Sequence, residues 1–456
     1  MKRLILLSAM VALIFGSATA QEATGPVLLN YKILQKKAAK SDEAIQAEKT
    51  AVKPTTWISR GKLFQDVDNQ GLEQAQLGMD ETMLKVTYKD PVSVETTEDN
   101  KKILKYDYIN YIFENGRLRG WTRNEPIVEK PLDEALKSYK KAIDLTEESK
   151  RAKLEDKLKP QFDELKTQFQ RYGQNQYYLE NYKDALYAFE AILDVNKFEV
   201  YNGLIDTLMV NYSGIVAREL GRQAKEAGNE KEAEEMYRKT IKYYQDLAEI
   251  GSGGSSAYIQ MTRDFYAIGD TLGAIENLKH GLELYPDSTI LVTVTAQAYY
   301  LMKDNEGGLE FIQERLNEKP QCPAAYYWKG LLITNKSDVE EDLIKEALAY
   351  YDTSLMYDPT NANVWYQSGY VNYAVGANYF EQESYEEDPG MREELNKKGV
   401  GYYEASVEKL EKAISVAAGD RTIVKEALDL LKRMYYKLYG GDDERYLDVN
   451  ERLKNL

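Results

Sequence analysis

Residues 256–286, SAYIQMTRDFYAIGDTLGAIENLKHGLELYP, decide the fold of this chain. Bulky and small residues alternate in this stretch at helical spacing, and a proline ends it. Thr262 is a small residue of the first half, and Ala274 follows it twelve positions later in the second half. Small residues at facing positions let two antiparallel helices approach closely. The stretch therefore predicts a helical hairpin.

The same pattern recurs with a period of 34 residues. Ala274 and Gly308 are separated by this distance, and so are Pro286 and Pro320. A fixed period of this length is typical of helical repeat arrays. Seven candidate units are found, and the two outer ones require long insertions. Their paired small residues, on the first and second helix, are Gly61 and Ala135, Gly173 and Ala185, Gly221 and Ala233, Thr262 and Ala274, Ala296 and Gly308, Gly330 and Ala347, and Gly369 and Ser406.

The units resemble the tetratricopeptide repeat, whose signature has these small residues, a bulky residue four positions further on and a closing proline. The resemblance covers roughly residues 30–455. It implies an all-α fold, a solenoid of helical hairpins in a right-handed superhelix, in which the first helix of each unit lines a concave groove. The residues that the resemblance places on this groove, and that we expect to bind a partner, are Tyr177, Arg263, Tyr266, Tyr300, Tyr327, Tyr366, Tyr370 and Tyr373.

Tyrosine is abundant in this chain, at 37 residues. A row of tyrosines offers large, stiff and amphipathic contact area, which suits an extended peptide segment or a carbohydrate. The alternative is that several of these rings pack against the neighbouring helix. The sequence leaves both interpretations open.

The order of the other segments gives the domain organisation. Residues 68–131 interrupt the first unit, are rich in β-branched and aromatic residues, and contain the turn sequence ENGR, which predicts a small insertion with β-strands. We expect a signal peptide (1–20), a split N-terminal unit (21–160), further units (161–250), a loop or hinge (251–256), units 257–420 with an acidic insertion at 378–398 that forms a solvated loop, and capping helices (421–456).

The beginning of the chain has the pattern of a secretory signal peptide. Two basic residues precede an apolar run at 4–15, and Ala18 and Ala20 fit the small-residue cleavage site. The run is too short to span a bilayer. Gln21, rather than a cysteine, follows the cleavage site, which argues against a lipid anchor. We therefore expect an exported, periplasmic protein of a Gram-negative envelope, with no transmembrane segment in the mature chain and, if attached at all, peripheral to the outer membrane.

Composition restricts the chemistry of the protein. The 75 acidic and 59 basic residues give a net charge of −16, which argues against nucleic acid as a partner. Cys322 and His280 are the single cysteine and histidine, so neither a disulfide framework nor a usual zinc site or Ser-His-Asp triad can be assembled. We predict no catalytic residue, no metal and no cofactor.

These observations favour a non-catalytic scaffold. It would bind a segment of a partner protein, in the periplasm or at the outer membrane, and support assembly of an envelope complex. The alternative is a glycan or peptidoglycan binder that uses a tyrosine-lined concave face. A third hypothesis is an enzyme that uses acidic residues of the 68–131 insertion.

Overall fold

The computed structural model describes residues 26–335, 340–417 and 419–456. The chain forms two compact units, Met1–Asp246 and Leu247–Leu456, which are described separately below. The predicted signal peptide, residues 1–20, lies outside the described residues. Within the described ranges, the structure has no helix that is long and apolar enough to cross a membrane.

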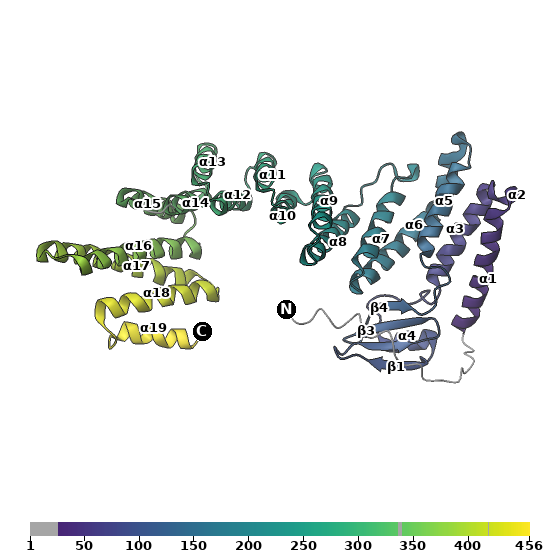
Figure 1. Cartoon of the computed structure of the whole chain (residues 1–456), viewed down its shortest axis with the longest axis horizontal. Helices are drawn as coiled ribbons and strands as arrows, with labels where there is room; N and C mark the ends of the chain where they lie inside the picture. The colour runs from purple at the N-terminus through teal and green to yellow at the C-terminus, as the bar shows by residue number, and fades with distance from the viewer. Residues whose placement is uncertain (1–25, 336–339, 418) are drawn as a thin grey trace. The chain divides into compact units, whose positions relative to one another are not determined.

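The first unit consists of helices with one small sheet inserted among them (Figure 1). The last helix of this unit, α9, continues past its boundary into the second unit. The elements are α1 (Pro26–Gln46), α2 (Glu48–Ala51), α3 (Pro54–Asn69), α4 (Glu81–Tyr88), β1 (Ser93–Thr96), β2 (Lys102–Lys105), β3 (Ile109–Glu114), β4 (Arg117–Arg123), α5 (Pro131–Asp144), α6 (Glu148–Tyr178), α7 (Tyr182–Val195), the 3-10 helix η1 (Glu199–Tyr201), α8 (Thr207–Glu226) and α9 (Glu230–Glu249).

Every regular element among the described residues of the second unit is a helix. Its elements are α10 (Gly254–Ala267), α11 (Thr271–Leu284), α12 (Thr289–Met302), α13 (Asn305–Glu318), α14 (Pro323–Thr334), α15 (Glu341–Tyr357), α16 (Ala362–Tyr385), α17 (Pro389–Val416), α18 (Arg421–Tyr439) and α19 (Glu444–Lys454). Together the described parts confirm the predicted all-α fold of helical hairpins with a small β-containing insertion near the N-terminus.

Close approach of the two helices in a hairpin depends on the small residues. A Cβ atom added at Gly61 on α3 would lie 2.6 Å from the ring of Tyr139 on α5, although the two residues lie on opposite sides of the inserted sheet in sequence. The distance from Gly173 to Phe189 is the same. Distances below 3.0 Å are not tolerated by a real side chain, so a larger residue would push the helices apart. The corresponding contacts elsewhere join Gly221 to Tyr237, Gly330 to Tyr351 and Gly369 to Leu410.

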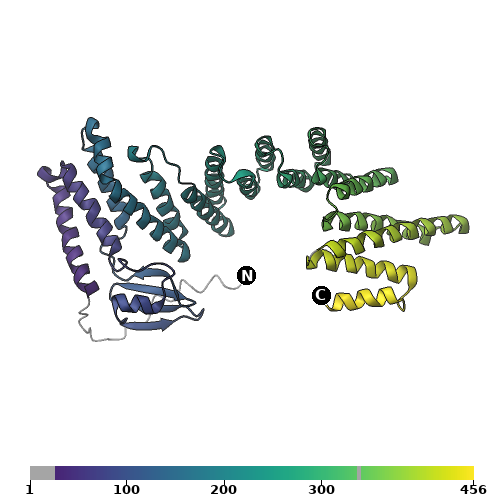
Figure 2. The same ribbon diagram turned by 180° about the vertical axis from the view of Figure 1, so that it is seen from behind.

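The insertion is a four-stranded antiparallel sheet in the order β1-β2-β3-β4, with α4 on one face (Figure 2). Leu84 of α4 packs with Leu104 and Tyr111 of the sheet in one buried cluster. Asn115 and Gly116, between β3 and β4, have φ angles of 52° and 72°. Two successive positive φ angles define the tight turn of a hairpin, which the ENGR sequence predicted.

The prediction that the acidic insertion at 378–398 forms a solvated loop is wrong. Helix α16 continues to Tyr385 and α17 begins at Pro389, so only residues 386–388 connect them. The helices persist because their facing sides stay buried: Phe380 is 8% exposed and its ring lies against Gly399. The acidic side chains occupy the outer faces of this extended hairpin.

The loop predicted at 251–256 is shorter than expected. Helix α10 begins at Gly254, so Ser255 and Ser256 are already helical. Gly253 adopts a φ of 84°, which ends the connection directly before the helix. Burial of Ala257 and Tyr258 then holds the first turn of α10 in place despite its glycine and serine content.

Candidate partner-binding groove

A hollow of about 310 Å³ lies between the first helices of two successive hairpins of the first unit. Helix α6 forms one side, α8 forms the other, and α7 contributes to the floor. Phe189 and Val216 are 3% and 1% exposed and form the apolar floor. The lining residues are Gln174, Tyr177, Phe189, Tyr212, Ile215 and Val216.

Tyr177 is the sequence-predicted residue that this groove contains. It is 43% exposed, and its ring contacts Tyr182 edge to face with ring centroids 5.3 Å apart. On the floor, Phe189 and Tyr212 have ring centroids 5.5 Å apart. Aromatic contacts of this kind hold the rings in fixed orientations. The groove therefore presents a preformed apolar surface.

Helix α8 extends this apolar surface with residues that the sequence analysis did not select. Leu208 and Ile215 are 48% and 37% exposed. With Tyr212 they follow the spacing i, i+4, i+7, which places them on one face of the helix. The sequence contained a signal for this surface: α8 has two apolar stripes. The stripe with Met209 and Val216 is buried, and the second stripe lies beside it.

Charged side chains border the groove on α8. Arg222 donates a hydrogen bond from Nε to Glu219, at 3.0 Å, and also pairs with Glu226. Burial raises the pKa of Tyr182 above its ordinary value, and the negative charges of Glu219 and Glu180 raise it further. Arg222 therefore uses the carboxylates of Glu219 and Glu226 within the protein, and the groove recognises a bound segment mainly through its apolar lining.

Two predicted residues of the second unit, Tyr300 and Tyr327, are half-buried and contact neighbouring rings. Tyr300 of α12 contacts Trp328 of α14, with ring centroids 6.1 Å apart. Tyr327 contacts both Trp328, at 5.4 Å, and Tyr351 of α15, at 6.1 Å. Burial raises the pKa of Tyr327. These rings form an aromatic chain through three helices, in which Tyr300 and Tyr327 stay partly exposed.

The other predicted residues of the second unit differ in exposure. Tyr370 is 44% exposed and stacks on Tyr366, with ring centroids 6.4 Å apart. Tyr373 is half-buried and stacks on Tyr403 at 5.4 Å. The remaining two, Tyr266 and Arg263 on α10, are both exposed. Tyr177 lies in the first unit and the other seven residues lie in the second, and a binding role for all eight stays a prediction.

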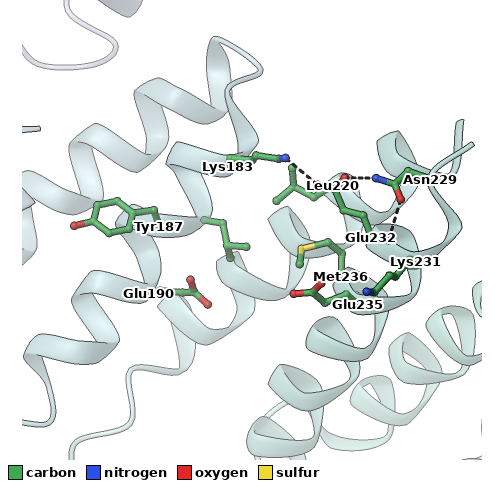
Figure 3. Close-up of a pocket in the computed structure, with 10 residues that line it drawn as sticks. Lys183, Tyr187, Glu190, Leu220, Asn229, Lys231, Glu232, Glu235 and Met236 are labelled. Carbon is green, nitrogen blue, oxygen red and sulfur yellow. Dashed lines mark hydrogen bonds and ion pairs between the residues drawn. The ribbon is translucent and has the colours of Figure 1, made fainter. Parts of the chain in front are cut away.

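A second hollow, of about 500 Å³, lies between α7 and α9 (Figure 3). Leu186, Leu220 and Met236 line it together with charged residues. Lys183 of α7 pairs with Glu232 of α9 at 2.8 Å and bridges the two helices. The bridge uses these charges within the protein, so this hollow offers a ligand less than the apolar groove does.

The single histidine and the single cysteine both lie in the second unit. In the described parts of the chain, no three His, Cys, Asp or Glu side chains come together as a metal site. The His280 side chain is 61% exposed, and its Nδ1 lies 3.1 Å from Glu283. Cys322 is 8% exposed and directly precedes α14.

The contacts within the hairpins identify the repeat. At the small-residue position of the first helix, each glycine meets the bulky residue four positions after the small residue of its second helix, as the repeat signature requires. The chain has the tetratricopeptide-repeat fold. No family model and no curated protein sequence matches the chain.

Several solved structures are similar to part of this tetratricopeptide-repeat chain. A TPR repeats protein from Bacteroides fragilis NCTC 9343 is 13% identical, spanning 58% of this chain and 97% of that one, with a TM-score of 0.31. MamA is 16% identical over 42% of this chain and 95% of that one, with a TM-score of 0.26. YrrB, a TPR protein with an unusual peptide-binding site, is 16% identical over 47% of this chain and 92% of its own chain, with a TM-score of 0.25.

Proposed function

We propose that this protein is a non-catalytic, exported scaffold that binds a segment of a partner protein in the groove between α6 and α8 and supports assembly of a complex in the cell envelope. The observation that carries the proposal is the preformed apolar groove with exposed Tyr177 and Ile215 on its two sides. Exposed apolar side chains gathered in a groove typically mark an interaction site.

The size of the groove suits an anchoring side chain. A hollow of about 310 Å³ is at the lower end of the range for ligand pockets, about 300–1,000 Å³. It accommodates one or two apolar side chains of an extended or helical segment. Burial of one such side chain contributes about 1.5–3 kcal/mol.

Binding to the partner tests the groove directly. The mature chain and its Tyr177→Ala and Ile215→Ala variants are compared for affinity to the partner that co-purifies with it. The variant that combines both substitutions should lose about 2 kcal/mol of binding free energy, which corresponds to a roughly 30-fold weaker affinity. Leu272→Ala, at an apolar residue that is 69% exposed on α11, is the matched control and should bind like the wild type. Equal affinity of all forms would contradict the proposal.

Export is a separate part of the proposal and rests on the signal-peptide pattern of residues 1–20. Its test is the N-terminal sequence of the protein isolated from its own cells, together with fractionation of those cells. We expect a mature chain that begins at Gln21 and is recovered with the periplasm. A chain that retains residues 1–20 in the cytoplasmic fraction would remove the envelope role and leave the groove untouched.

Binding of a glycan is the second candidate, because Tyr366 and Tyr370 stack with an angle of 25° between their planes and Tyr370 is exposed. Burial raises the pKa of Tyr366 to about 12, and the nearby carboxylate of Glu426 contributes to this shift. An exposed ring beside a carboxylate suits a sugar. Co-sedimentation with purified peptidoglycan that survives high salt and is lost in Tyr370→Ala would favour this function over the protein scaffold.

A further inference from the structure

The inserted sheet has two edge strands, and the protein covers only one of them with its described residues. At β4, the Leu118 N–H donates to the Met79 carbonyl and the Leu118 carbonyl accepts from the Gly78 N–H, both at 2.8 Å. The backbone of Gly78 and Met79 therefore pairs with the first half of the β4 edge.

A side chain pairs with the second half of the β4 edge. The Trp121 N–H donates to Oδ1 of Asn175 on α6 at 2.8 Å, and the Trp121 carbonyl accepts from its Nδ2 at 3.1 Å. Asn175 is 1% exposed, so its amide acts as a buried substitute for a neighbouring strand. Gly120 permits this contact, since a Cβ there would lie 2.7 Å from the Tyr178 ring. The β4 edge is thus closed.

The opposite edge, β1, is open. All four of its residues are exposed, and among the described residues β2 is the one strand that pairs with it. The Thr97 N–H donates to the Lys101 carbonyl and closes the β1–β2 hairpin. Because hydrogen-bonded pairs alternate along an antiparallel ladder, Ser93 and Glu95 also face inward to β2, and the Val92 N–H donates to the Lys105 carbonyl at 2.8 Å. Val94 and Thr96 consequently direct their N–H and C=O groups away from the sheet.

The side chains of β1 do not protect this edge. Val94 lies opposite Leu104 and on the same face, which is the face that α4 covers, yet it is 48% exposed. Val92, two positions earlier, is 73% exposed. Proteins usually block an open edge with charged side chains or proline. Glu95, the single charge on β1, is directed to the other face and pairs with Lys105 at 2.5 Å.

The length of the edge determines what can bind there. Four residues at about 3.4 Å each form an edge about 14 Å long. Such an edge is too short to supply the roughly 1,000 Å² of buried surface that a stable contact between two folded copies needs. An extended segment needs no such area, because main-chain hydrogen bonds supply its affinity and alternate side chains supply its specificity.

We propose that β1 is a strand-addition site, at which an extended segment of a partner protein with apolar residues at alternate positions pairs with Val94 and Thr96 and covers Val92. The site is separate from the groove between α6 and α8 and extends the sheet by one strand. The segment is polar on its other face, where it lies beside Glu95 and Lys105.

The test uses the mature full-length chain and a blocked, fluorescein-labelled peptide of sequence KTVTVTVK. Amide hydrogen exchange, resolved to single residues, should show protection of Val94 and Thr96 by about tenfold when the peptide is in excess, with Ser93 and Glu95 unchanged. The same peptide N-methylated at its six central residues cannot form the ladder and should give no protection.

Two variants sharpen the result. Val94→Pro removes one outward N–H and leaves the β1–β2 hydrogen bonds intact, so peptide affinity measured by fluorescence anisotropy should fall by about fivefold. Val94→Thr keeps the N–H and the side-chain shape and should bind within about twofold of the wild type. Unchanged Trp121 fluorescence checks that the insertion remains folded. Protection absent from Val94 and Thr96, no binding of the parent peptide, or equal binding of the N-methylated peptide would overturn the proposal.

Discussion

Replacement of Gly61 by alanine tests the helix contact that defines the repeat. A Cβ atom at this position would lie 2.6, 2.7 and 2.9 Å from three carbons of the Tyr139 ring. The ring is completely buried, and its hydroxyl donates to Oε1 of Gln65 at 2.5 Å, so it cannot move aside freely. Overpacking of this kind costs about 1–3 kcal/mol. The better helix propensity of alanine offsets up to about 1 kcal/mol of that cost.

A matched glycine shows the propensity effect without the clash. Gly401 lies within α17 and is exposed, and beyond its own helix backbone no heavy atom lies within 4 Å of the place that a Cβ atom would occupy. Gly401→Ala should therefore stabilise its helix by about 0.5–1 kcal/mol. The same substitution thus has opposite effects at the two sites, separated by about 1–3 kcal/mol.

Hydrogen exchange measured by mass spectrometry suits this comparison, because repeat proteins need not unfold in one step. Peptides from α3 and α5 should exchange faster in Gly61→Ala, and peptides from α17 should exchange more slowly in Gly401→Ala. If both variants stabilised their helices equally, the close contact between α3 and α5 would not exist and the reasoning would be refuted.

Three further predictions concern the insertion and the tyrosines. Asn175→Ala leaves the buried N–H and C=O of Trp121 without partners, which should cost about 2–4 kcal/mol and appear as faster amide exchange in β4. Gly116→Ala places a side chain at a φ of 72° and should destabilise the β3–β4 hairpin by about 1–2 kcal/mol, visible as a lower urea midpoint of Trp121 fluorescence. Burial raises the pKa of Tyr366 and Tyr403 to about 12, so their contribution to stability is complete below about pH 10 and is lost as the pH rises toward 12. Urea titrations at about pH 8 and about pH 11 should show this loss, and equal stability at both would contradict it.

The fold could be predicted because its determinants are local or periodic. Gly61 and Tyr139 are far apart in sequence, but each stands at its signature position within its own helix, so the pair could be matched across the insertion. The turn at residues 114–117 could also be predicted from adjacent residues, because asparagine followed by glycine favours two successive positive φ angles.

The errors arose where tertiary packing overrides composition. The acidic composition of residues 378–398 suggested a loop, yet burial of Phe380 against Gly399 keeps both helices regular. Likewise, serine and glycine at 254–256 suggested a flexible connection, but the packing of Tyr258 begins a helix there.

The candidate groove could be predicted only in part. Tyr177 followed from its position in the repeat, whereas Leu208 and Ile215 did not, because an exposed apolar stripe and a buried one have the same period. Asn175 gave no local signal at all, since its partner Trp121 is 54 residues away. Such long-range pairs depend on how the insertion docks on α6.

The most direct test of the groove is site-specific photocrosslinking in the native cells. Tyr177 is replaced by p-benzoylphenylalanine, and Leu272, which is exposed outside the groove, is replaced in the same way as the control. We predict that position 177 forms one crosslinked adduct with a protein partner, that Ile215→Ala reduces this adduct, and that position 272 does not form it. The same adducts from both positions, or none from position 177, would contradict the assignment of the groove as the binding site.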